Sequence, residues 1–110
     1  MRYKERHTLN ERKSESARIK DRYNGLVPVI IESKNMVLTK KKYLVPNHLT
    51  IGQFVFFVRK QLSIRPEKAI FLYINGRLPP TSESVLTIQT SEMDEDGFLY
   101  MEIEEENTFG

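Results

Sequence analysis

The sequence predicts one α+β domain, in which a well-capped helix packs on a sheet of four strands. Runs of β-branched and aromatic residues alternate with helical patterns, which gives the order helix, strand, strand, helix, strand, short helix, strand. The chain has 110 residues, the length of a single domain. It contains no cysteine, so disulfides and thiolate metal sites take no part in its stability.

The region 40–62 is the part of the chain around which the other elements are expected to assemble. Lys40 to Val45 predicts a strand, and Pro46 predicts its end because proline has no amide hydrogen for a ladder. Thr50 and Gln53 have the spacing of a capping box, so a helix is expected to begin directly after Thr50.

The helix that follows Thr50 is predicted to be amphipathic. Phe56 and Phe57 lie outside its main apolar stripe and indicate a second apolar surface, which would form a groove. The stripe itself has helical spacing and is expected to be buried; it consists of Ile51, Phe54, Val55, Val58 and Leu62.

An N-terminal helical extension is also predicted. The first seven residues are long enough for one short helical turn only. Thr8 and Glu11 form another capping box, so a helix is expected from Leu9 to about Tyr23, with Gly25 as its C′ residue. The helix has few apolar residues and should lie on the outside of the fold. Its remaining face is basic: Arg12, Lys13, Arg18, Lys20 and Arg22.

Three further strands are expected. Residues 27–33 are apolar and β-branched, which is typical of a strand covered on both faces, and Pro28 leaves an amide position free near its start. Residues 69–74 predict a strand that ends at an Asn75-Gly76 turn. Residues 98–104 alternate with a period of two, which predicts a half-buried strand with Leu99, Met101 and Ile103 inward.

Short connections complete the predicted organisation. Ser82 or Ser84 would cap a short helical turn that contains Val85, and residues 93–97 are acidic and turn-like. The chain is therefore expected to consist of a helical extension (1–25), a main domain (26–104) and a flexible tail (105–110) that ends in glycine.

The net charge of +2 conceals a strong polarity along the chain. Residues 1–42 carry twelve basic and five acidic side chains, whereas residues 78–110 carry nine acidic side chains and no basic one. Either these segments form solvated faces of one domain, or a basic face binds acidic partners or anionic lipid, through Lys4, Arg6, Arg12 and Lys13. Nucleic-acid binding is not expected, because no motif that reads bases is present.

The motifs of catalytic sites are missing from the sequence. His7 and His48 are its two histidines, and neither belongs to a metal-binding or nucleophile motif. We therefore expect no enzyme activity, no metal and no cofactor. No apolar run approaches the ~20 residues that span a bilayer, and no secretory signal is evident, so a cytoplasmic protein is expected.

Several motifs together resemble one family. The segments KKKYLVP (40–46) and LTIGQF (49–54) are similar to the signature of the autophagy ubiquitin-like modifiers, the GABARAP-like family of the autophagy-related protein 8 type. The similarity continues in the family's order through residues 27–32, 79–82, 97–100 and 109–110. The resemblance implies a ubiquitin-like β-grasp with added N-terminal helices, in which the strand 40–45 lies at a sheet edge.

The resemblance also implies a function. Gly110 would be activated, transferred through thioesters of ubiquitin-like activating and conjugating enzymes, and joined to the amine of phosphatidylethanolamine; an autophagy cysteine protease would reverse this step. The protein would be a monomer in the cytoplasm and, when lipidated, on autophagosomal membranes, where it would recruit cargo receptors and adaptors with aromatic-x-x-aliphatic motifs. The alternatives are a non-covalent peptide-binding adaptor in vesicle or receptor trafficking, and a ubiquitin-like modifier of proteins.

The edge strand is the expected binding site, because its unpaired N–H and C=O groups can receive a partner strand. Side chains alternate along a strand, so Tyr43 and Val45 should face one side and Lys42 and Leu44 the other. The alternative is that Leu44 belongs to the core and the lysines only protect the edge from aggregation. By resemblance, the ligand backbone would pair with Lys42 and Leu44.

The resemblance implies two apolar pockets beside this strand. Pocket one would take the aromatic residue of the motif, and its expected residues are Glu15, Ile19, Pro28, Ile30, Lys42, Leu44 and Phe98. Pocket two would take the aliphatic residue, and its expected residues are Tyr43, Val45, Pro46, Leu49, Phe54, Phe57 and Val58. Lys40 and Lys42 would attract acids that flank the motif. Leu26 and Gln61 stand where family members commonly carry arginines, so partner choice is expected to differ.

Overall fold

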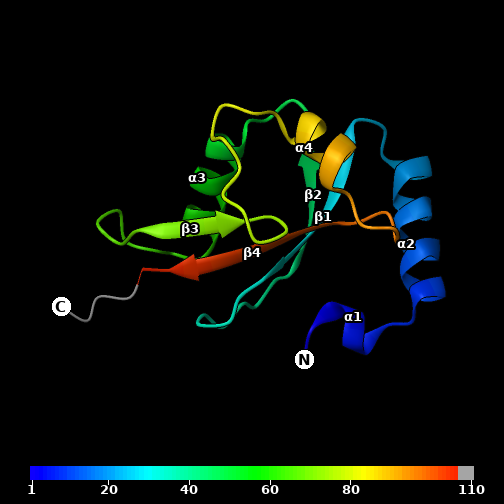
Figure 1. Cartoon of the computed structure of the whole chain (residues 1–110), viewed down its shortest axis with the longest axis horizontal. Helices are drawn as coiled ribbons and strands as arrows, with labels where there is room; N and C mark the ends of the chain where they lie inside the picture. The colour runs from blue at the N-terminus through cyan, green and yellow to red at the C-terminus, as the bar shows by residue number, and fades with distance from the viewer. Residues whose placement is uncertain (107–110) are drawn as a thin grey trace.

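A four-stranded mixed sheet with the strand order β2-β1-β4-β3 forms the centre of the computed structural model, which describes residues 1–106 (Figure 1). β1 (Leu26–Glu32) pairs antiparallel with β2 (Lys42–Pro46) and parallel with β4 (Leu99–Glu105). β3 (Ile70–Tyr73) pairs antiparallel with β4. The α+β class and the mixed sheet are confirmed, and β2 lies at one edge of the sheet as expected.

One face of the sheet packs against α3 (Ile51–Gln61) and α4 (Val85–Glu92), which lie on the same side of it in Figure 1. The predicted capping box at the start of α3 is confirmed: the Gln53 amide donates to the Thr50 hydroxyl at 3.1 Å, and the Thr50 amide donates to Gln53 Oε1 at 2.9 Å. Three residues of the predicted stripe are fully buried: Ile51, Phe54 and Val58. The other two, Val55 and Leu62, are partly buried and pack against the same core.

The opposite face packs against α1 (Tyr3–Arg6) and α2 (Leu9–Arg22), which form a smaller apolar cluster with it: Tyr3, Ile19, Ile30 and Phe98. β1 is therefore covered on both faces, as its run of apolar residues predicted. The alternation placed Phe98 on the outward face of a strand with one buried face, and this was wrong, because the side chain is 0% exposed. The N-terminal helices cover the face on which Phe98 lies, and the alternation within one strand gives no information about that cover.

Local turn and cap signals predicted the connections well. The Thr8 and Glu11 capping box starts α2, and Ser84 caps α4 through the amide of Thr87. Asn75 and Gly76 both have positive φ, 51° and 79°, and form a two-residue turn. Gly25 has φ 82°, but it stands two residues after the C-cap Tyr23 and is therefore C″ rather than C′.

The bounds of all four strands differ from the predicted ones by one or two residues, and the differences in β2 and β4 matter most for the edges of the sheet. β2 begins at Lys42 rather than Lys40 and includes Pro46, which pairs with Leu26. An edge strand accepts proline where the missing amide hydrogen would point to solvent. β4 continues through Glu105, and the Glu106 amide donates to the Ala69 carbonyl oxygen at 2.8 Å. Residue 105, which the sequence suggested as the first residue of a tail, therefore belongs to the sheet.

Candidate peptide-binding site

The outer edge of β2 has a backbone that no other described strand pairs with. The Ile31 amide donates to the Lys41 carbonyl oxygen at 2.7 Å, and the Asn47 amide donates to the Gly25 carbonyl oxygen at 2.9 Å. The backbone groups of odd-numbered β2 residues therefore point toward β1, because direction alternates along an antiparallel ladder. Those of Lys42 and Leu44 point outward, where an incoming strand could pair with them.

The side chains of β2 divide between the two faces of the sheet as predicted. Tyr43 is 4% exposed and Val45 is buried beside it, on the side of α3. Leu44 is 38% exposed and Lys42 is half-buried, on the side of α2. Leu44 is therefore not a core residue, and the free strand edge has an accessible apolar side chain at its centre.

The residues expected to form pocket one come together between α2, β1, β2 and the start of β4. Ile19, Ile30 and Phe98 pack in one apolar cluster, and Pro28 is buried at the start of β1. Glu15 and Lys42 form an ion pair across the space between α2 and β2. Leu44 extends this surface along the strand, since Pro28 is its register partner on β1. The residues predicted for pocket one thus form a surface in which an ion pair lies beside buried apolar side chains.

The carboxylate of Glu15 has two hydrogen-bond donors. Tyr3 Oη donates to Glu15 Oε2 at 2.9 Å, and Lys42 Nζ donates to Glu15 Oε1. Burial raises the pKa of Glu15, but the hydrogen bonds from Lys42 and Tyr3 outweigh it, so the pKa lies below its ordinary value. Glu15 is therefore ionised at neutral pH and competes with any ligand acid for the Lys42 ammonium.

The residues expected to form pocket two lie around three aromatic rings. The centroid of the Tyr43 ring is 6.2 Å from that of Phe54 and 6.2 Å from that of Phe57. Phe57 is 43% exposed, whereas Val58 and Val45 are buried in the main core together with Phe54. Leu49 and Pro46 are half-buried. The accessible part of this set therefore consists of Phe57, Leu49 and Pro46, above a buried base.

Two lysines, Lys40 and Lys42, supply positive charge beside the residues predicted for the two pockets. Lys40 Nζ lies 4.7 Å from the centroid of the Tyr43 ring, a cation–π geometry, although Lys40 itself precedes β2. Leu26 is half-buried at the start of β1, and Gln61 is exposed at the end of α3. The charge near the peptide edge consequently comes from Lys40 and Lys42 rather than from these two positions.

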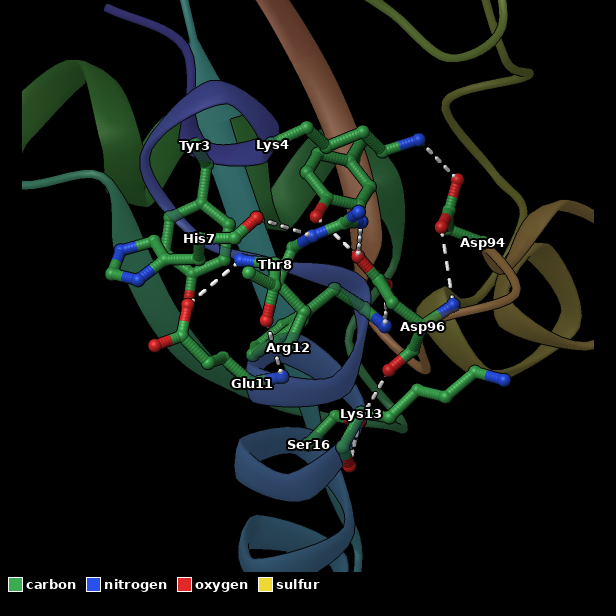
Figure 2. Close-up of polar contacts among 12 residues, drawn as sticks. Tyr3, Lys4, His7, Thr8, Glu11, Arg12, Lys13, Ser16, Asp94 and Asp96 are labelled. Atoms are coloured by element: carbon green, nitrogen blue, oxygen red, sulfur yellow. Dashed lines mark hydrogen bonds and ion pairs between the residues drawn. The ribbon is translucent and has the colours of Figure 1, made fainter.

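A buried polar cluster around Asp96, which no sequence pattern predicted, joins α2 to the turn before β4 (Figure 2). Asp96 is 1% exposed, and its Oδ2 accepts hydrogen bonds from Arg12 Nη1 at 2.6 Å and Tyr100 Oη at 2.5 Å. Burial and the hydrogen bond to Asp96 raise the pKa of Tyr100. Arg12, predicted on a solvated basic face, is instead an internal ion-pair partner, and Asp96 was predicted only as part of an acidic turn.

Ion pairs also fix α1, which is too short to be stable alone. Arg2 Nη1 lies 2.9 Å from Glu102 Oε1 and 3.5 Å from Glu32 Oε1. Lys4 Nζ lies 2.5 Å from Asp94 Oδ1. The buried Tyr3 ring packs edge-on against Phe98, with 5.5 Å between the centroids. The N-terminal helices are therefore fastened directly to the elements that surround pocket one.

Comparison with known proteins identifies the family. The model of the family described as "Autophagy protein Atg8 ubiquitin like" matches residues 11–110. The chain belongs to the Atg8 family. Autophagy-related protein 8A of Oryza sativa subsp. indica is 48% identical over 98% of this chain and 94% of the relative. Autophagy-related protein 8d of Arabidopsis thaliana is also 48% identical, over 98% of this chain and 93% of the relative.

Solved structures of Atg8 proteins confirm the ubiquitin-like fold. The crystal structure of Trypanosoma brucei ATG8 has a TM-score of 0.92 and 39% identity, and the match covers 100% of this chain and 98% of that one. Plasmodium falciparum Atg8, solved in complex with a Plasmodium falciparum Atg3 peptide, has a TM-score of 0.87 and 28% identity, with 94% of this chain and 95% of that one covered.

Two further observations concern this Atg8-family chain. Within residues 1–106, no group of side chains is arranged to hold a metal ion, and no helix has the length and apolar character needed to cross a bilayer. The residue expected to be conjugated, Gly110, lies outside the described residues.

Proposed function

We propose that this chain is an autophagy modifier that binds aromatic-x-x-aliphatic motifs along the outer edge of β2 and is conjugated through Gly110 to phosphatidylethanolamine. It would act in the cytoplasm and, once lipidated, on autophagosomal membranes, where it recruits cargo receptors and adaptors. The observation that carries the proposal is that, among residues 1–106, no strand pairs with the outward backbone groups of Lys42 and Leu44, and the residues of one predicted pocket lie on each side of them.

The geometry supports the binding mode in three ways. An extended ligand could add a fifth strand, since β-strand addition needs an unpaired edge. The Leu44 side chain, 38% exposed, provides apolar contact at the centre of that edge. Lys40 and Lys42 supply positive charge for acids that flank the motif. Family membership and the Atg3-peptide complex of the Plasmodium falciparum relative support a peptide-binding role.

A proline substitution at the strand edge tests this mode. Leu44→Pro removes the outward amide hydrogen, which no described strand uses, and an edge strand accepts proline at such a position. We expect binding of a Trp-x-x-Leu peptide with upstream acids to weaken at least about fivefold, because each main-chain hydrogen bond at a desolvated interface contributes roughly 1 kcal/mol or more. Isothermal titration calorimetry would measure the affinity of each variant.

Leu44→Ala is the matched control for this experiment. It shortens the same side chain but keeps the amide hydrogen, so it should weaken binding less than Leu44→Pro. Circular dichroism and thermal unfolding must first show that both variants are folded. If folded Leu44→Pro binds the peptide as tightly as Leu44→Ala, the ligand does not pair with β2 and the proposed binding mode is wrong.

The conjugation half of the proposal concerns Gly110. Glycine has no side chain, so its carboxylate is unhindered for adenylation and thioester formation, and the family match extends through this position. Activating and conjugating enzymes of a related Atg8 system, ATP and phosphatidylethanolamine liposomes would be incubated with wild type and with Gly110→Ala. We expect the variant to be lipidated much more slowly. Equal lipidation of wild type and a variant that lacks Gly110 would show that Gly110 is not the conjugated residue, and no lipidation of wild type would leave a non-covalent adaptor as the better function.

A further inference from the structure

We propose that Asp96 is a positioning residue for pocket one: it fixes α2 against the start of β4 and thereby sets the space available to the ligand's aromatic side chain. This inference rests on the proposed function, because it concerns the same peptide site. Asp96 itself belongs to neither predicted pocket and is 1% exposed, so it acts through its neighbours.

The carboxylate of Asp96 joins three segments of the chain, as Figure 2 shows for its contact with Arg12. Oδ1 accepts from the Phe98 amide at 2.8 Å, which holds a residue that is predicted for pocket one and directly precedes β4. Oδ2 accepts from Arg12 on α2 and from Tyr100 on β4. A buried carboxylate is costly unless it is paired and hydrogen-bonded, so these partners have little freedom to move away.

A second contact fixes α2 one turn farther along. Ser16 is buried, and its Oγ donates to the main-chain carbonyl oxygen of Asp96 at 2.5 Å. Arg12 and Ser16 are four residues apart, so they lie on the same face of the helix. The adjacent Gly97 shows how closely the elements approach, since a Cβ atom there would lie 3.0 Å from Ser16 Cβ. The contacts of Arg12 and Ser16 with Asp96 therefore restrict both the position of α2 along its axis and its rotation about that axis.

The rotation of α2 determines where two pocket-one residues stand. Glu15 directly precedes Ser16, and Ile19 follows it by one turn and packs in the same cluster as Phe98. One wall of pocket one thus depends on α2 and another on Phe98, and Asp96 is bonded to both. The residues predicted for pocket two come from β2, α3 and the turn between them, and within residues 1–106 none of them hydrogen-bonds to Asp96. Asp96 should therefore affect the aromatic position of a ligand and leave the aliphatic position unaffected.

A double-mutant cycle between protein and peptide tests this selectivity. The protein variants are Asp96→Asn, which weakens the contacts to Arg12 and Tyr100, and Ser16→Ala, which removes only the second attachment. The peptides are Trp-x-x-Leu, Ala-x-x-Leu and Trp-x-x-Ala, each with the same upstream acids. NMR titration measures the weak binding of the truncated peptides, and thermal unfolding checks that each protein is folded.

We expect Asp96→Asn to weaken the Trp-x-x-Leu and Trp-x-x-Ala peptides by roughly tenfold and to leave Ala-x-x-Leu nearly unchanged, which is the coupling expected of connected residues. Ser16→Ala should show the same pattern with a smaller amplitude, and it decides the question if Asp96→Asn does not fold. Arg77→Ala is the matched control: it removes an ion pair with Glu92 of α4, which packs on the other face of the sheet, so it should leave the ratio between peptides unchanged.

Two results would overturn the proposal. In one, the folded Asp96 and Ser16 variants weaken all three peptides equally, which is a general structural effect; in the other, they weaken none. Failure of the proposed function would look different, because wild-type protein would then bind the three peptides with the same affinity or not at all.

Discussion

Glu15 connects the N-terminal helices to the edge strand through a single carboxylate. It accepts hydrogen bonds from Tyr3 of α1 and Lys42 of β2, while it belongs to α2 itself. Three elements consequently depend on the ionisation of one residue. A ligand acid that binds Lys42 must replace part of this interaction, so an upstream acid should improve affinity by less than an unpaired lysine would suggest.

The depressed pKa of Glu15 leads to a pH prediction. Because the folded pKa lies below the ordinary value of 4.5, the ionised group stabilises the fold fully above pH 4.5, and this contribution is lost as pH falls through the folded pKa. Glu15→Gln should therefore lower the free energy of unfolding at pH 7, and the difference from wild type should shrink as pH falls below 4.5. Urea unfolding at a series of pH values would measure both proteins.

Glu95→Gln is the control for this prediction, because Glu95 is exposed and forms no ion pair with any described residue. It should change the free energy of unfolding little at any pH. A difference between wild type and Glu15→Gln that is constant from pH 7 to pH 3 would show that the Glu15 charge does not stabilise the fold.

Individual residues were predictable where a local pattern or a family motif describes their surroundings. The resemblance placed Glu15 and Lys42 together at the predicted site, and in the structure these two residues form an ion pair. Arg12 and Asp96 were not recognised as a pair, since 84 residues separate them and each also fits a solvated charged segment. Burial of a charge depends on partners that are distant in sequence, which the pattern of one segment does not contain.

Elements were predicted best where their ends have local chemical signals. The caps at Thr8 and Thr50 and the Asn75-Gly76 turn were correct because capping and positive φ depend on a few neighbouring residues. The start of β2 was placed two residues too early, because three consecutive lysines fit a strand as well as a loop. The start of β2 depends on which of these residues pair with β1, and that register is set by the packing of the whole sheet.

The close approach of α2 to the turn before β4 gives a prediction at Gly97. This residue has φ 92°, and a Cβ atom there would overlap the Ser16 hydroxyl oxygen. Gly97→Ala should therefore lower the free energy of unfolding by roughly 2 kcal/mol or more, because backbone strain and a steric clash add together. Chemical denaturation would measure the loss, and hydrogen exchange should show that α2 loses protection.

Gly76→Ala separates the two causes. Gly76 has a similar φ of 79°, but a Cβ atom there would meet nothing within 4 Å, so only the backbone strain of roughly 1 kcal/mol applies. The excess loss for Gly97→Ala should fall when Ser16→Gly is introduced with it. Equal losses at the two glycines would mean that α2 does not pack tightly against the turn.

For the whole molecule, the charge polarity of the sequence serves partly to hold the fold together. Cations from the first twelve residues pair with acids that lie 84 to 100 residues farther along: Arg2 with Glu102, Lys4 with Asp94 and Arg12 with Asp96. The sequence suggested two explanations for the charge polarity, solvated faces or a basic binding face. The structure adds a third, which is ion pairing between the two ends of the chain. The charges of Lys4 and Arg12 are partly neutralised by these ion pairs, so the two residues should attract an anionic membrane less strongly.

The remaining basic residues of α2 give the last prediction. Lys13, Arg18 and Arg22 are exposed, and none forms an ion pair with a described residue. Near an anionic membrane each cation contributes about 1 kcal/mol, so changing all three to Ser should reduce binding to phosphatidylserine vesicles strongly at low salt and little at high salt. Vesicle co-sedimentation at two salt concentrations would measure this.

The matched control changes Lys34, Lys60 and Arg65 to Ser, which alters the net charge equally but leaves α2 intact. Equal losses for the two triple variants would show that net charge, and not the α2 face, governs the association.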